Sequence, residues 1–278
     1  MATSTAPSLK LSPLPPSVGR VGLAGALRSE YTKLRSVRST YWSLLVLALV
    51  GIGIGAAISA GQASDLSAHP GDRVGFDPTQ TSLGAFFFIG QLVIVVLGAL
   101  VITSEYSTGM IRTSLTAMPR RGVVYAAKAA VFGAVALVFS LVTSFIAFFV
   151  GQLILSGTVS ATLSQPHVLR AVVGTAAFVA VVGMIAFGLG AIIRHTAGAI
   201  TTAVGLMFVI RIIVQFLPDT WRWDLIRFMP DSAGQVISAT VGPSNPHLWS
   251  PWPQFAVTAI YAVVLLAAGA HLFRKRDA

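Results

Sequence analysis

The sequence has 278 residues, of which 55% are hydrophobic and only 10% are charged, and its formal net charge is +10. A soluble globular protein carries about 25% charged residues, so this composition excludes an ordinary cytosolic enzyme, a disordered chain and a nucleic-acid-binding domain. The chain has no cysteine, which excludes disulfides, thiol nucleophiles and cysteine-ligated metal sites. We therefore predict an integral membrane protein.

The N-terminal region divides into two parts. Residues 1–19 are rich in proline and serine and predict a disordered tail. Residues 20–38 place apolar side chains three or four positions apart among five bases, which predicts a cationic amphipathic helix in the membrane interface. A solvated juxtamembrane helix is the alternative. The residues assigned to the interfacial helix include Arg28, Glu30, Tyr31, Leu34 and Arg35.

Six apolar runs follow, and each is long enough for a helix to cross the hydrocarbon core of a bilayer. The third run is longer than one crossing needs, so we expect it to tilt, kink or project from the membrane. The predicted fold class is an all-α membrane protein whose transmembrane helices cover approximately residues 41–60, 83–103, 123–155, 168–193, 197–217 and 255–273.

The positions of the basic residues predict the orientation. With the N-terminus inside, 14 of the 19 Lys and Arg residues lie in cytoplasmic segments or at the inner ends of spans. Cytoplasmic loops carry this excess in membrane proteins. We therefore predict a multi-pass protein of the cell membrane with both termini in the cytoplasm.

Other polar and small residues have local interpretations. Asp231 or Ser232 can begin a short helix that runs to about Thr240, and the tryptophans on either side suggest that this helix lies against the outer leaflet or dips into it. Arg211, inside the fifth span, is expected to reach the outer headgroups or to pair with Asp219, although buried membrane charges are often functional. The GxxxG pair at residues 51–55 predicts close helix packing, within or between subunits.

The segment between the second and third spans is the most informative. Glu105 closes the second span, and Gly109 can end that helix in a left-handed conformation. Residues 110–118 then form a short amphipathic helix that Pro119 ends. Such a helix is suited to receiving force from a soluble partner, and an ordinary connecting loop is the alternative.

This segment, EYSTGMIRTSLTAMPRR at residues 105–121, resembles the cytoplasmic loop of permease subunits of type-2 ABC exporters. The segment before the first span, LRSEYTKLRSVRST, the six spans and the long loop before the sixth are similar to that family in order. The resemblance implies a transport subunit driven by a separate cytosolic ATPase that binds ATP and Mg²⁺. It also implies outward transport and a dimer with a second copy or a paralogue.

The resemblance assigns ATPase coupling to the segment after the second span, with its apolar side in a groove of the ATPase. The residues concerned are Glu105, Met110, Ile111, Arg112, Leu115, Met118, Arg120 and Arg121. The chain itself lacks the glycine–lysine pair of a phosphate-binding P-loop, and it shows no HExxH or GxSxG motif. We therefore predict a non-enzymatic subunit without a cofactor or metal of its own.

The low charge of the predicted pathway favours a hydrophobic or amphipathic substrate, drug-like or lipid-like. A self-sufficient channel or secondary transporter is the competing hypothesis. That class usually places carboxylates inside its spans, whereas here Glu105 lies at the boundary of the second span.

Overall fold

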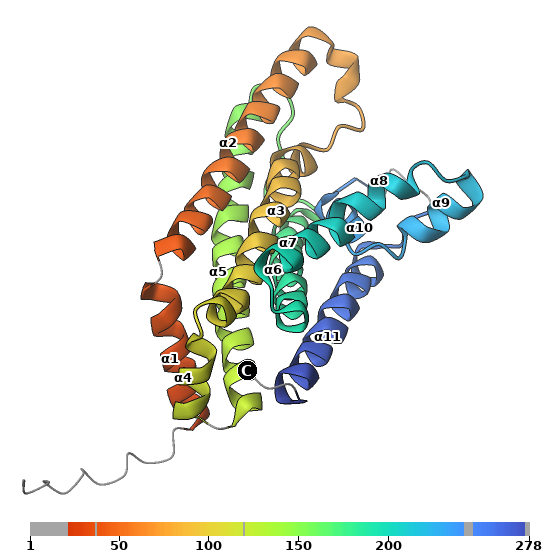
Figure 1. Ribbon diagram of the computed structural model, residues 1–278. Helices are drawn as coiled ribbons and strands as arrows, with labels where there is room; N and C mark the ends of the chain where they lie inside the picture. The colour runs from red at the N-terminus through yellow and green to blue at the C-terminus, as the bar shows by residue number, and fades with distance from the viewer. Residues whose placement is uncertain (1–21, 37, 119, 242–246, 276–278) are drawn as a thin grey trace, which may run out of the picture.

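The computed structural model describes residues 22–36, 38–118, 120–241 and 247–275, and all regular elements within these ranges are helical. Six of the helical segments are long and apolar enough to span a membrane, which confirms the predicted number of spans. The predicted tail at residues 1–19 lies outside the described residues, as does Pro119. Figure 1 shows the bundle that the six segments form.

The helix bounds extend most of the predicted spans by several residues. The spanning helices are α2 (Arg38–Ala68), α3 (Pro78–Ser107), α5 (Arg121–Leu155), α6 (Val168–Ile193), the segment from α7 (Thr196–Val204) through a π-helical turn η2 (Gly205–Val209) to α8 (Ile210–Val214), and α11 (Pro251–Lys275). The short elements are α1 (Leu23–Ser36), η1 (Pro70–Arg73), α4 (Met110–Ala117), α9 (Asp219–Ile226) and α10 (Ser232–Ser238).

Helix α6 is the centre of the bundle and packs against α3, α5, α7, α10 and α11. Glycines allow the closest of these contacts, as is common between helices in membranes. A Cβ added to Gly98 of α3 would lie 2.3 Å from the carbonyl oxygen of Gly183 in α6, and one on Gly188 would lie 2.9 Å from the backbone of Leu265 in α11. These backbones therefore touch without intervening side chains.

The GxxxG pair of the first span packs within the chain. A Cβ on Gly51 would lie 3.0 Å from the ring of Phe86, and one on Gly55 would lie 3.1 Å from the carbonyl oxygen of Ser82. Both neighbours belong to α3. This use of the pair joins α2 to α3 inside one subunit.

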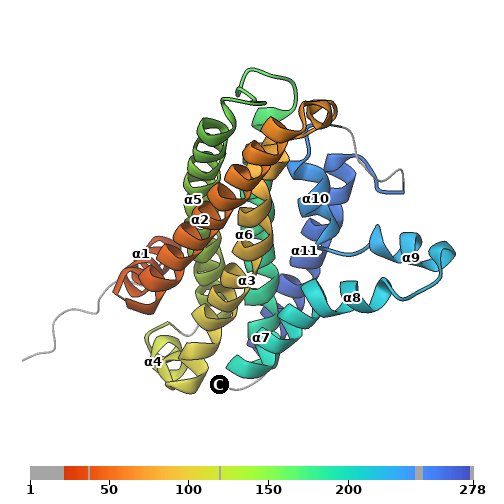
Figure 2. The ribbon, with the colours of Figure 1, turned by 90° about the horizontal axis from the view of Figure 1, so that it is seen from above.

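The fifth span differs from the straight helix predicted at residues 197–217. Its helical turns widen to a π-helical turn at Gly205–Val209, and the helix ends at Val214. The chain then passes through α9, which lies to the side of the bundle in Figures 1 and 2. A π turn is a recognised cause of a bend in a helix.

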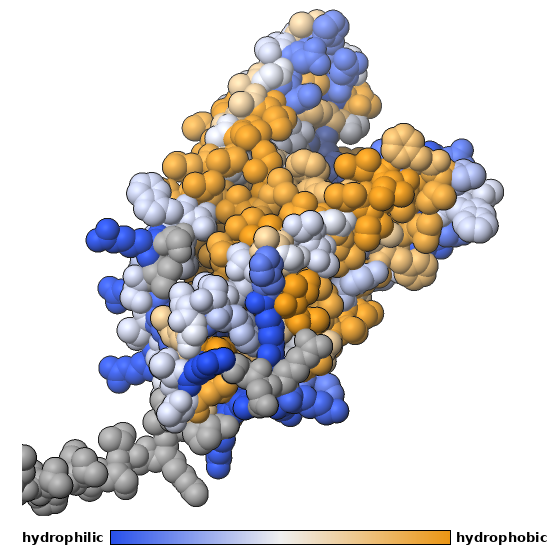
Figure 3. Space-filling view, in the orientation of Figure 1, coloured by the Kyte–Doolittle hydropathy of each residue, from blue (hydrophilic) through white to orange (hydrophobic). Residues whose placement is uncertain are grey.

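The two ends of the described chain lie at the same end of the bundle. Leu23 of α1, Arg121 of α5 and Arg274 of α11 line one shallow groove there. Figure 3 shows an apolar band across the middle of one face, with hydrophilic residues gathered at the end that contains α1 and α4 and at the loop after α2. An even number of spans agrees with this arrangement.

Helix α10 corrects the expectation of a helix against the outer leaflet. It contacts α3, α6 and α11, and six of its seven residues are buried. Asp231 holds the N-cap position but its side chain makes no capping hydrogen bond. The two serines of α10 bond to backbone carbonyls instead: Ser232 Oγ donates to Ile226 at 2.6 Å and Ser238 Oγ donates to Gly234 at 2.8 Å. Small residues let this helix enter the bundle, which the flanking tryptophans did not indicate.

Candidate functional site

The junction between α3 and α4 is a tight turn. Thr108 ends α3 with its amide bonded to the carbonyl of Ser104 at 3.1 Å, and Gly109 follows with φ of 71°. Residues with a Cβ disfavour this left-handed conformation. The predicted cap at Gly109 is therefore confirmed, and α4 begins at the next residue.

Helix α4 turns its apolar side toward its own chain. Ile111 is only 2% exposed and belongs to the main core, and Met118, just after the helix, is 8% exposed. Met118 and Leu115 pack with Ala26 of α1 and Val124 of α5. In this conformation Leu115 and Met118 therefore pack against α1 and α5, and Ile111 lies in the main core, so these three side chains contact the protein's own helices.

The outward side of α4 is polar and basic. Arg112, Thr113 and Thr116 are exposed, and so is Arg120 just before α5. Of the apolar residues predicted to couple, Met110 alone remains substantially exposed, at 45%. Arg121 begins α5 and is half-buried. Any partner at α4 therefore meets positive charge and hydroxyl groups first.

Four charged side chains lie on the inner side of α4 and join three helices. Three of them are buried and the fourth, Lys33, is half-buried. We name Glu30 and Lys33 of α1, Glu105 of α3 and Lys128 of α5 the charged cluster. Lys33 Nζ lies 2.7 Å from Glu30 Oε1 and 3.2 Å from Glu105 Oε1, and Lys128 Nζ lies 2.7 Å from Glu105 Oε1 and also contacts Glu30 Oε2. Lys33 Nζ additionally donates to Ser114 Oγ of α4 at 3.0 Å. Glu105 therefore contacts a base from each of two neighbouring helices, α1 and α5.

The cluster balances two negative charges with two positive ones. The side chains of Glu30, Glu105 and Lys128 are 4–7% exposed, and that of Lys33 is 28% exposed. Desolvation alone would lower the pKa of Lys33, but the hydrogen bond that Lys33 donates to Glu30 and the charges of Glu105 and Glu30 raise its pKa above the ordinary lysine value of 10.5. Burying ions is costly unless each finds partners, so the four charges require one another.

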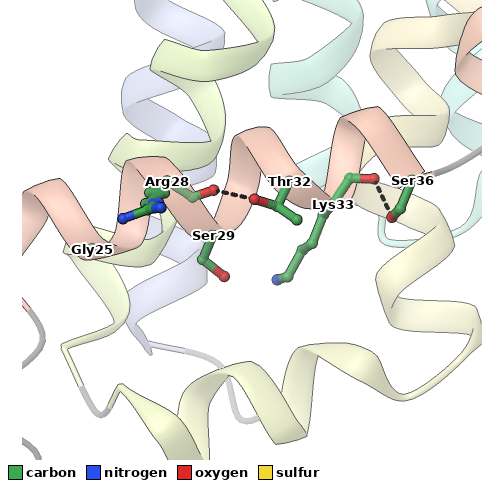
Figure 4. Close-up of a pocket in the computed structure, with 6 residues that line it drawn as sticks. All are labelled: Gly25, Arg28, Ser29, Thr32, Lys33 and Ser36. Carbon is green, nitrogen blue, oxygen red and sulfur yellow. Dashed lines mark hydrogen bonds between the residues drawn. The ribbon is translucent and has the colours of Figure 1, made fainter.

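Figure 4 shows how Lys33 reaches this position. Its side chain leaves α1 on the side of α4, while Thr32 and Ser36 bond to backbone carbonyls of α1 itself. Arg28 and Lys33 both line a shallow pocket along α1, which Figure 4 draws. Glu30 and Lys33 are three residues apart, which places them on one face of α1.

The predicted interfacial segment is helical, and one of its buried residues is charged. The buried residues of α1 are Ala26 and Glu30, so its buried side is not purely apolar. This side packs along α5. Arg28, Tyr31 and Arg35 are exposed, and Leu34 is half-buried. Val21 and Val37, which completed the predicted stripe, lie outside the described residues.

Sequence reasoning missed Lys128 as a site residue and counted it only as a base that sets orientation. Two signals could have identified it. Lys128 interrupts the apolar run of the third span, and Glu30 and Glu105 are the two glutamates of the entire sequence. Two isolated carboxylates at span boundaries and one lysine about 10 Å into a helix, at 1.5 Å rise per residue, indicate a buried ion pair.

A second polar site lies at the opposite end of the bundle. Arg211 of α8 pairs with Asp231 before α10, so the prediction that it pairs with Asp219 is wrong. Asp219 pairs with Arg222 three residues away. Desolvation raises the pKa of Asp231, and the charge of Arg211 offsets part of this rise. The burial of α10 among α3, α6 and α11 brings Asp231 to Arg211, and this burial could not be inferred from local spacing.

Among the described residues, no three or more His, Asp or Glu side chains gather as metal ligands would. No curated protein matches the chain in sequence. A family model described as a protein of unknown function, DUF2705, matches residues 71–278. The match covers five of the six spans, α4 and half of the charged cluster, and the chain therefore belongs to the DUF2705 family.

Proposed function

We propose that this protein is the membrane subunit of an ATP-driven exporter and that a separate cytosolic ATPase acts on it through α4. The observation that carries the proposal is the attachment of α4. Gly109 joins α4 directly to α3, apolar contacts join it to α1 and α5, and Ser114 bonds to the charged cluster. A force on α4 would therefore reach three helices at once.

The exposed residues of α4 suggest what the ATPase would present. Arg112 and Arg120 are exposed with the hydroxyls of Thr113 and Thr116 between them. We infer an acidic groove on the partner, with Met110 as the apolar contact. Charge complementarity of this kind orients partners and speeds their association more than it strengthens binding.

The remaining parts of the proposal follow from the sequence. The distribution of bases supports a cell-membrane protein with α1, α4 and both termini in the cytoplasm. Six spans without a nucleotide site would form half of a pathway, so two such subunits, identical or paralogous, would pair with two ATPase subunits. The low charge of the spans favours a hydrophobic or amphipathic substrate.

The proposal is tested with a charge reversal on α4 and a matched reversal elsewhere. Arg112→Glu places a like charge against the inferred acidic groove, so it should reduce co-purification of a P-loop ATPase and the ATP-driven transport of the reconstituted complex. Lys275→Glu places the same charge change on an exposed residue at the same end of the bundle and should leave both intact. Equal ATPase recovery from the two variants, or transport by the purified chain in liposomes without ATP, would instead support a self-sufficient channel or secondary transporter.

A further inference from the structure

We propose that a cavity beside the charged cluster binds a neutral amphiphile that carries a hydroxyl group. The cavity has a volume of about 300 Å³ and lies where α1, α2, α3, α4 and α5 meet. Its size is at the lower end for pockets that hold small molecules. The binding would be a property of the isolated chain and does not depend on an ATPase.

The walls of the cavity change from polar to apolar along α3. Glu105 and Ser104 lie at its polar part with Lys128 of α5, and Leu97, Leu100 and Val101 of α3 form an apolar wall. These three apolar residues belong to a spanning helix. A ligand with a polar head and a hydrocarbon chain fits this order of side chains, with the head at the charged cluster.

The hydrogen bonds within the charged cluster indicate which head group a ligand in the cavity would need. A lysine ammonium has three donors. Lys33 uses three, on Glu30, Glu105 and Ser114, whereas Lys128 uses two, on Glu30 and Glu105. The second carboxylate oxygen of Glu105, Oε2, has no partner among the described residues. Both residues line the cavity, so one donor of Lys128 and one acceptor of Glu105 are without a partner among the described residues beside it.

A hydroxyl group satisfies both at once, because it donates one hydrogen bond and accepts others. An ionic head group would not fit as well. The charged cluster is already neutral, so an added carboxylate or ammonium would lie in a buried site without a counter-charge. The chemistry therefore selects an alcohol such as the glycerol end of a monoacylglycerol.

The absence of native cysteine makes the test direct. Ser104→Cys places a thiol among the residues that line the cavity, and Ser107→Cys places one on α3 one turn later, outside the cavity. Both positions are exposed, so both thiols can react. Each variant is reconstituted in phosphatidylcholine nanodiscs, a lipid without a hydroxyl group, and its rate of reaction with a small uncharged thiol reagent is measured. The added probes are monooleoylglycerol, methyl oleate and oleate, which share a chain and differ in the head.

We expect monooleoylglycerol to slow labelling of Ser104→Cys several-fold and to leave Ser107→Cys unchanged. Methyl oleate, which cannot donate, and oleate, which is anionic, should protect much less. Adding Leu100→Trp to Ser104→Cys fills the apolar part and should remove the protection. The proposal is overturned if no probe protects Ser104→Cys, if the three probes protect equally, or if both thiols are slowed alike.

Discussion

The two ends of the bundle hold their segments together with different chemistry. At the end with α4, the charged cluster joins three helices by pairing four ionic side chains, three of which are buried. At the other end a single carboxylate, that of Asp77, joins two segments by hydrogen bonds. Asp77 accepts hydrogen bonds from the amides of Thr79 and Gln80 at the start of α3, and from Thr240 and Val241 after α10.

The difference lies in what each arrangement loses when one member is removed. The donors around Asp77 are mostly backbone amides, which are neutral and can turn to water near a loop. The members of the charged cluster are ions, and the loss of one leaves its buried partners with unbalanced charge. The end with α4 should therefore be the more sensitive to a single substitution, and the end with Asp77 the more tolerant.

The largest effect is expected for Lys128→Met. This change leaves Glu30 and Glu105 to share Lys33, and breaking a buried ion pair from one side costs about 3–5 kcal/mol. Helix α1 should separate from α5. A cysteine at Ala26, which is 6% exposed, should then react much faster with a thiol reagent, whereas a cysteine at the exposed Ala24 should not change.

A second substitution separates charge imbalance from lost packing. Combining Lys128→Met with Glu105→Leu removes one charge of each sign and leaves the pair of Lys33 and Glu30, 2.7 Å apart. Labelling of the cysteine at position 26 should return toward the original rate, since removing both partners is often tolerated. No recovery would mean that packing, not charge, holds α1.

An intermediate effect is expected for Asp77→Ala. The change removes the N-cap of α3, worth about 0.5–2 kcal/mol, and frees the segment after α10. Asp77→Asn keeps one acceptor oxygen and should cost less. Thermal unfolding of the purified protein should rank the alanine variant below the asparagine variant, with the exposed Asp72→Ala unchanged. If Asp77→Ala lowers the unfolding temperature as much as Lys128→Met does in the same assay, the two ends do not differ in sensitivity.

The smallest effect is expected from moderate alkali. Because the folded-state pKa of Lys33 is raised above 10.5, its ionised form is favoured by folding, and its contribution to stability is complete below that pH. It is lost only as the pH rises through the raised value. The labelling ratio of cysteines at positions 26 and 24 should therefore stay constant from neutral pH to about pH 10. A rise in this ratio near pH 8 would show that the lysine is not held as an ion.

Local rules predicted much of the fold. In lipid every backbone amide must be bonded internally, so an apolar run of sufficient length becomes a helix. This constraint predicted the six apolar helices, and the predicted bounds of α6, residues 168–193, agree with the structure. The left-handed turn at Gly109 and the short helix after it were likewise predictable, because glycine is the residue that adopts such a turn freely.

The candidate site depended on contacts that no local rule contains. The amphipathic pattern of α4 predicted an apolar side but not that α1 and α5 would cover it, and the spacing near Arg211 suggested Asp219 where the fold supplies Asp231. The sequence by itself determined which segments cross the membrane, because hydrogen bonding within a helix is local. Tertiary structure alone decided which buried charges meet, because Glu30, Glu105 and Lys128 are brought together across 98 residues only when α1, α3 and α5 pack.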